Sequence, residues 1–223
     1  MNEPITQKIT LLTVEEFYAI YGNKEERYEL INGIPYMMAA PGRVHQELCT
    51  FLFGELFNFL KDKKCKVFVA PFDVFLNESP KDKNGKPIKN KRTKGSVVQP
   101  DLMVICDKEK IKPDGIHGAP DFIIEIASLS TKDRDKGDKL YKYASSGVKE
   151  YWIVDPSEEL IRVYKFEPRS KKAEVTDFTF KDKIKSHVLD GLEIDFSQTD
   201  FDFDEFHEFG IEAYKNKRRY TKL

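Results

Sequence analysis

The first part of the chain alternates apolar and polar residues in patterns that predict two helices and a hairpin. Residues 13–21 begin with the capping-box pattern T-V-E-E and place their apolar side chains on one helical face. Residues 27–31 alternate in polarity, Asn32-Gly33 is a strong type I′ turn signal, and residues 34–39 continue as a strand. Residues 43–60 carry an apolar stripe at helical spacing. We therefore expect an N-terminal helix, a β-hairpin and a long amphipathic helix, in that order.

The rest of the chain is dominated by β-forming residues. The predicted strands lie at residues 66–70, 72–76, 97–106, 120–127, 150–155, 160–166, 173–180 and 183–189, with a polar segment at 107–119. One further helix over 133–146, which Gly147 ends, connects strands 120–127 and 150–155. Such a crossover joins parallel strands and is right-handed. The pattern predicts an α/β fold: a mixed, twisted β-sheet flanked by helices, with the N-terminal helix and hairpin added.

The length and the lack of any internal repeat or linker predict a single domain over residues 1–223. We expect its core at about 10–190, and an acidic edge segment followed by a basic tail over 195–223. The sequence has no leader pattern and no apolar run of membrane-spanning length, so we expect a cytoplasmic protein with no membrane partner. The cysteines at positions 49, 65 and 106 form no C-x-x-C pair, and we expect free thiols.

Charge gives no global sign of nucleic-acid binding. The chain has 37 Lys and Arg against 38 Asp and Glu, a formal net charge of −1. Residues 81–94, however, hold seven basic residues against one acid. Such a run is either a solvated hairpin tip or a local phosphate contact.

Two apolar runs each carry one carboxylate, Asp101 in 97–106 and Glu125 in 120–127. A carboxylate buried in a strand costs several kcal/mol unless it is paired, hydrogen-bonded or bound to metal. Two such acids on neighbouring strands indicate a divalent-metal site, and hard oxygen ligands favour Mg²⁺ or Mn²⁺. The simpler alternative is that both acids sit at strand ends and face water.

Lys139 is the candidate ammonium for this site, because it lies on the helix that follows the Glu125 strand. A lysine near a metal can position water or stabilise developing charge on a phosphodiester. The alternative is an Asp135–Lys139 pair at i,i+4 on a solvated helix face, worth a few tenths of a kcal/mol.

The ordered set of these residues resembles the Uma2 endonuclease family of the PD-(D/E)xK superfamily, which has the restriction-endonuclease-like fold. The resemblance rests on Pro100-Asp101, Glu125 in I-I-E-I-A-S, Asp135-x-x-x-Lys139-x-x-x-Tyr143, Gly147 and E-Y-W-I-V-D-P, and extends over roughly residues 10 to 190. It implies that Asp101 and Glu125 are metal ligands. The superfamily lysine expected two residues after the glutamate is Ala127 here, and the resemblance implies that Lys139 takes its role.

The resemblance thus implies a metal-dependent endonuclease that hydrolyses phosphodiester bonds in DNA, and by analogy a homodimer. Glu29 and His45 are secondary candidates: a third acid can help to hold a second metal, and a histidine can orient water or contact phosphate. Taken alone, Glu29 is more typical of a hairpin surface and His45 of a helix start. Tyr143 and Trp152 are expected in the core. The competing hypothesis is a catalytically inactive nucleic-acid-binding or interaction module on the same fold.

Overall fold

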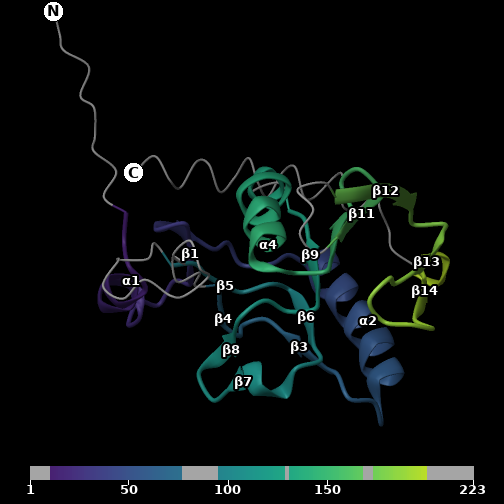
Figure 1. Cartoon of the computed structure of the whole chain (residues 1–223). Coiled ribbons are helices and arrows are strands. Elements are labelled where there is room, and N and C mark those ends of the chain that lie inside the picture. The colour runs from purple at the N-terminus through teal and green to yellow at the C-terminus, as the bar shows by residue number, and fades with distance from the viewer. Residues whose placement is uncertain (1–10, 77–94, 129–130, 168–172, 200–223) are drawn as a thin grey trace, which may run out of the picture.

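The computed structural model describes residues 11–76, 95–128, 131–167 and 173–199, and in this part the strands form two six-stranded sheets and one two-stranded sheet (Figure 1). The first sheet has the order β2-β1-β5-β4-β8-β7, with β1 Tyr28–Ile31, β2 Ile34–Met37, β4 Val74–Phe75, β5 Val97–Val98, β7 Ile111–Lys112 and β8 Gly115–His117. The second has the order β12-β11-β10-β9-β6-β3, with β3 Lys66–Val69, β6 Leu102–Ile105, β9 Phe122–Ile126, β10 Glu150–Asp155, β11 Leu160–Phe166 and β12 Ala173–Thr179. The small sheet pairs β13 Lys183–Lys185 with β14 Glu193–Asp195.

The helices are α1 Val14–Tyr21, α2 Arg43–Leu60, α3 Lys132–Arg134, η2 Asp135–Lys139, which is a π-turn, and α4 Leu140–Ser146, with short 3₁₀ turns η1 Lys108–Lys110 and η3 Phe196–Gln198. Both six-stranded sheets are mixed, because β9 and β10 run parallel in one and β4 and β8 run parallel in the other. This confirms the α/β class, the mixture of parallel and antiparallel strands, and the parallel crossover from 120–127 to 150–155.

Local signals account for the N-terminal elements. The capping box at Thr13 is formed, since its hydroxyl accepts a hydrogen bond from Glu16 N at 3.2 Å and its own N–H donates to Glu16 Oε2 at 2.9 Å. Asn32 and Gly33 have positive φ of 51° and 86°, as a type I′ turn requires. The hairpin then pairs Glu29 with Tyr36 across the two strands.

Side-chain alternation on β9 divides the second sheet into two faces. Phe122, Ile124 and Ile126 pack with the apolar face of helix α2, in a core that also holds Trp152. Ile123 faces the other way, into a core shared with the first sheet and with Tyr143 of helix α4. Glu125 follows Ile123 at period two, so its side chain is directed into the interior between the sheets. Figure 1 shows α2 beside the second sheet and α1 next to β1.

The sequence predicted one sheet, but the structure has two six-stranded sheets. The predicted strand 97–106 contributes one part to each of them. β5 belongs to the first sheet and β6 to the second, with Gln99-Pro100-Asp101 between them. Pro100 has no N–H to donate to a ladder, and Gln99 N donates to the Glu29 side chain instead of a strand. Asp101 therefore lies at the seam where the chain passes from one sheet to the other.

Two smaller expectations also change. The polar segment 107–119 contains η1, β7 and β8 rather than only loop. The strand predicted at 183–189 ends at residue 185. The basic run 81–94 and the tail from residue 200 onward lie outside the described residues. Within those residues, no helix is long and apolar enough to cross a membrane.

The expectation of three free thiols is wrong, because Cys65 and Cys106 form a disulfide. Cys65 directly precedes β3, Cys106 directly follows β6, and the register pairs Lys66 with Ile105, so the two cysteines are opposite each other. Their separation of 41 residues gave no local signal of this pairing. Cys49 is free and buried on α2.

Candidate active site

A cluster of charged side chains occupies the seam between the two sheets, beneath the helix that begins after β9. Within the described residues it brings together the carboxylates of Glu29, Asp101, Glu125 and Asp135 and the cations Lys139 and Arg134. Glu29 comes from β1, Asp101 from the seam, Glu125 from β9, and the remaining residues from α3 and η2.

Lys139 is the centre of this cluster. Its ammonium lies 2.9 Å from Glu29 Oε1 and 2.9 Å from Glu125 Oε1, and 3.8 Å from Asp135 Oδ1. The side chain is only 5% exposed. Burial by itself lowers the pKa of Lys139, but the surrounding carboxylates, Glu125 first, hold that pKa well above its usual range. The ammonium therefore stays charged at neutral pH.

Glu125 is buried at 3% exposure and receives two hydrogen bonds on one oxygen. Lys139 Nζ and the Tyr143 hydroxyl donate to Oε1 at 2.9 and 2.6 Å, while Asp101 N donates to Oε2 at 3.4 Å. Burial raises the pKa of Glu125 well above its ordinary value; Lys139 opposes this rise and the nearby acids add to it. Glu125 therefore binds a proton more readily than an exposed glutamate does.

Asp101 and His45 form the more open side of the cluster. Each side chain is 17% exposed, and His45 Nε2 lies 3.1 Å from Asp101 Oδ2. The same Oδ2 accepts a hydrogen bond from Ile126 N at 2.8 Å. Because β9 donates to Asp101 and the Asp101 backbone donates to Glu125, the two carboxylates are tied to each other through the backbone.

Glu29 is fully buried, which corrects the view that a hairpin acid at this position faces solvent. Its Oε1 accepts from Gln99 N at 2.8 Å and from Lys139 Nζ, whereas its buried Oε2 has no hydrogen-bond partner within the described residues. Gln99 in turn donates through Nε2 to Asp73 at 2.8 Å, which extends the network to the first sheet.

Asp135 joins the cluster from the first turn of η2, and pattern reasoning treated it only as a partner on a solvated face. It is 2% exposed, and burial raises its pKa to about 6. Its Oδ1 has no hydrogen-bond partner in the described part of the chain. The solvated-face alternative for Asp135 and Lys139 is therefore wrong, since both side chains are interior.

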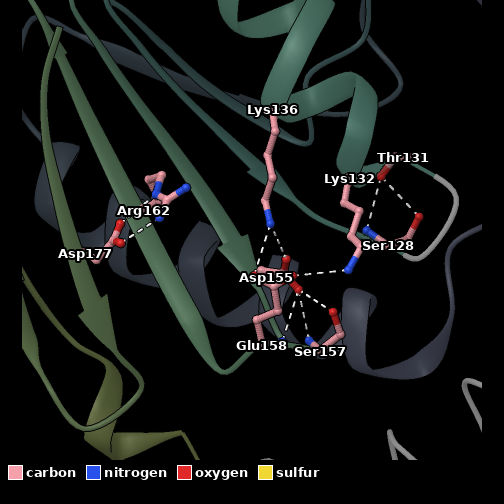
Figure 2. Close-up of polar contacts among 9 residues, drawn as sticks. All are labelled: Ser128, Thr131, Lys132, Lys136, Asp155, Ser157, Glu158, Arg162 and Asp177. Atoms are coloured by element: carbon pink, nitrogen blue, oxygen red, sulfur yellow. Dashed lines mark hydrogen bonds and ion pairs between the residues drawn. The ribbon is translucent and has the colours of Figure 1, made fainter.

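The helix that carries Lys139 is fixed on its other side by a polar clamp, which Figure 2 shows. Lys136 Nζ lies 3.1 Å from Asp155 Oδ2 and 3.2 Å from Glu158 Oε2, and Lys132 Nζ lies 3.2 Å from Glu158 Oε1 (Figure 2). Asp155, at the end of β10, also accepts from the Ser157 hydroxyl at 2.6 Å. Ion pairs to a rigid strand end hold the π-turn in place, and such turns often mark functional sites.

The model of the Uma2 family, described as "Putative restriction endonuclease", matches residues 14–197. The chain belongs to the Uma2 family. A solved structure described as a "putative nuclease belonging to DUF820", from Anabaena variabilis ATCC 29413, is similar with a TM-score of 0.61 and 18% identity, covering 83% of this chain and 96% of that one. No match was found among curated proteins. The likeness confirms the restriction-endonuclease-like fold, and the family description supports a nuclease.

The structure places all five candidate residues of this Uma2 member in one cluster. Asp101, Glu125 and Lys139 meet at the seam, Glu29 contacts Lys139, and His45 contacts Asp101. Sequence reasoning missed three further members: Asp135, Arg134, and Tyr143, which was assigned to the core alone. The i,i+4 spacing of Asp135, Lys139 and Tyr143 was the available signal, since it places all three on one helical face.

The donor set suits a hard divalent cation. Two buried carboxylate oxygens, Glu29 Oε2 and Asp135 Oδ1, lack a donor, and the acids outnumber the cations around them. Among the described residues, no three His, Cys, Asp or Glu side chains are gathered as a ready ligand set. Asp101 and Glu125 could therefore hold a metal only with water or substrate completing its coordination, an arrangement that Mg²⁺ commonly adopts.

Proposed function

We propose that this protein is a metal-dependent endonuclease that hydrolyses phosphodiester bonds in DNA. In this proposal, Asp101 and Glu125 hold Mg²⁺ or Mn²⁺, and Lys139 supplies a fixed positive charge. The observation that carries the proposal is the buried Lys139 ammonium, 2.9 Å from Glu125, at a seam that also contains Asp101. Membership of the Uma2 family and the nuclease neighbour support it.

A divalent ion held by Asp101 and Glu125 would neutralise phosphate charge and lower the pKa of a bound water. The protein's own contribution is positional. Asp101 receives a hydrogen bond from the β9 backbone, and Glu125 lies within β9, so both carboxylates belong to a rigid sheet. His45 touches Asp101 on its exposed side and thereby fixes the orientation of that carboxylate.

Lys139 acts as a charge donor and not as a general base, because its pKa is held above its usual range. Its charge is aimed at the negative charge that develops on a phosphoryl group, where a preorganised donor is most effective. Glu29 and Asp135 keep the ammonium in position from two sides. Tyr143 donates to Glu125 and restricts the rotation of that carboxylate.

The test is incubation of purified protein with supercoiled plasmid and with single-stranded DNA, each with Mg²⁺, Mn²⁺ or EDTA. We expect nicking or linearisation with either metal and none with EDTA. Asp101→Asn and Glu125→Gln should abolish cleavage, while Asp177→Asn, in an exposed pair with Arg162, should cleave like wild type. Cleavage in EDTA, or full activity of Asp101→Asn, would contradict the proposal.

A second candidate function is nucleic-acid binding without catalysis. It is favoured by Ala127, which offers no ammonium on the strand, and by a Lys139 charge already shared between two carboxylates. Metal-dependent cleavage decides between the two candidates. We also propose, by analogy alone, that the protein forms a homodimer; light scattering during gel filtration gives the mass directly.

A further inference from the structure

We propose that Arg134, stacked on Tyr36 beside the carboxylate cluster, binds a backbone phosphate of the nucleic acid. This inference deepens the proposed function and rests on it for the nature of the ligand. Arg134 ends the short helix α3, one residue before the π-turn that carries Asp135 and Lys139.

Within the part of the chain that the structure describes, the guanidinium of Arg134 is held in place but makes no hydrogen bond. Its central carbon lies 4.6 Å from the centre of the Tyr36 ring, a distance typical of a cation–π contact. Its Nη1 lies 3.8 Å from Glu29 Oε2, which is too long for a hydrogen bond. Within the described residues, its side chain has no other polar partner. This planar group with five N–H donors therefore has no hydrogen-bond acceptor among the residues that the structure describes.

The Tyr36 ring beneath the Arg134 guanidinium is itself held from two sides. Tyr36 stands directly opposite Glu29 on the neighbouring strand, and its hydroxyl donates to Asp138 Oδ2 at 3.1 Å. The Tyr36 ring is thereby fixed between the hairpin and the π-turn, and the Arg134 guanidinium lies on its face. The facing Glu29 Oε2 has no hydrogen-bond partner among the described residues, so Arg134 meets it only as an ion pair at 3.8 Å.

Exposure separates the buried floor of the cluster from the side chains at its rim, which solvent reaches. Glu29, Glu125, Asp135 and Lys139 have side chains at most 5% exposed, which places them in the floor. Arg134 is 17% exposed, the same value as Asp101 and His45. A phosphate arriving from solvent can therefore meet the guanidinium fork, which matches phosphate oxygens in a bidentate manner.

A cation at this position would offset the repulsion between the carboxylate cluster and a phosphate group. The chain has a net charge of −1, and the acids of the cluster repel a phosphodiester. Neighbouring basic side chains are already engaged: Lys132 and Lys136 pair with Glu158, and Arg162 makes two 2.7 Å bonds to Asp177 (Figure 2). Arg134 is the nearby cation whose donors are free to receive substrate in the described part of the molecule.

The decisive measurement is DNA binding as a function of salt, by fluorescence anisotropy with a labelled 20-base-pair duplex and the matching single strand. Measurements in EDTA and in Ca²⁺ separate binding from cleavage. Arg134→Met should weaken binding roughly 10-fold or more, the scale of one hydrogen bond to a charged group. It should also flatten the slope of log K against log salt by about 0.9 on duplex DNA. Arg134→Lys should restore most of the slope but only part of the affinity.

The controls separate phosphate binding from a structural role. Arg162→Met removes an equally charged side chain that is already paired, and should leave affinity and slope unchanged. Tyr36→Phe keeps the ring and loses only the hydrogen bond to Asp138, so it should bind more tightly than Tyr36→Ala, which removes the platform and should behave like Arg134→Met. Urea midpoints for all variants identify any loss that comes from unfolding.

The outcomes also separate this inference from the proposed function. Wild-type affinity and slope for a folded Arg134→Met would overturn the inference while leaving nuclease activity standing. If the wild type binds DNA through Arg134 but does not cleave it with metal, the inference holds and the nuclease proposal fails. A wild type that binds neither duplex nor single strand in EDTA or Ca²⁺ would overturn the inference.

Discussion

Replacement of Lys139 by methionine should destabilise the fold in a pH-dependent manner. Lys139→Met keeps most of the side-chain volume and removes the charge that faces Glu29 and Glu125, both of which are essentially buried. Breaking a buried ion pair by removing one partner costs about 3–5 kcal/mol, because the remaining charge stays in a poorly solvated place. A solvated Asp135–Lys139 pair, the alternative that the helix pattern offered, would cost only a few tenths of a kcal/mol.

The pH dependence follows from the raised pKa of Glu125. A carboxyl whose pKa is raised by folding binds more protons in the native state than in the unfolded state, so stability falls as pH rises between the two pKa values. Lys139 lowers the pKa of Glu125, so its loss raises the folded-state pKa further. The pH range over which stability falls begins at the ordinary pKa of about 4.5 and then extends to higher pH. Each affected group then changes stability by about 1.4 kcal/mol per pH unit within the window. The stability deficit of Lys139→Met should therefore be largest at pH 8 and much smaller at pH 5.

Urea unfolding at pH 5 and pH 8, followed by tryptophan fluorescence, measures both effects. Trp152 is fully buried and adjacent to Phe122, so its emission should report unfolding. Lys165→Met is the matched control, since Lys165 pairs with Glu174 at 3.4 Å on the surface and such a pair is worth at most about 1 kcal/mol. A deficit below about 1 kcal/mol that is equal at both pH values would refute the burial argument.

Three further predictions address the site and its support. Calorimetric titration of Mn²⁺ should give weaker binding to Asp101→Asn than to wild type, because one of two proposed carboxylate ligands is lost; equal affinity would remove Asp101 from the ligand set. Asp155→Asn breaks the clamp to Lys136 and should lower kcat several-fold with little change in KM for DNA, and a change in KM alone would argue against positioning of the Lys139 helix. Glu150→Gln should cost about 1–3 kcal/mol in urea unfolding, because buried Glu150 accepts from Trp152 Nε1 at 2.7 Å and from Ser186 Oγ at 2.7 Å; an unchanged midpoint would show that these bonds contribute nothing net.

The sequence by itself determined the local elements. The capping box at Thr13, the Asn32-Gly33 turn and the stripe of α2 are all patterns within a few residues, and each forms as expected. The parallel pairing of β9 with β10 also followed from the chain, because one helix joins two strands in the only common crossover arrangement. The candidate residues Asp101, Glu125 and Lys139 could be named because the order of motifs along the chain resembles that of Uma2 proteins.

Only the tertiary structure decided which charges share one environment. The hairpin pattern predicted that Glu29 is a surface acid. It is buried, because Lys139 from the helix after β9 packs against it at the seam. The helix pattern predicted Asp135 on the surface and Tyr143 in the core. Both face the same cluster from one side of that helix. The Cys65–Cys106 disulfide likewise depends on the antiparallel register of β3 and β6.

The physical reason is the range of the interactions. Periodicity and turn chemistry act over one or two turns of chain, so a sequence pattern can express them. Burial, pKa and ion pairing depend on which strands become neighbours, and here the site is assembled by a break at Pro100 that sends β5 and β6 to different sheets. That break places Asp101 beside Glu125 and brings the hairpin acid Glu29 to Lys139, which no local pattern of residues specifies.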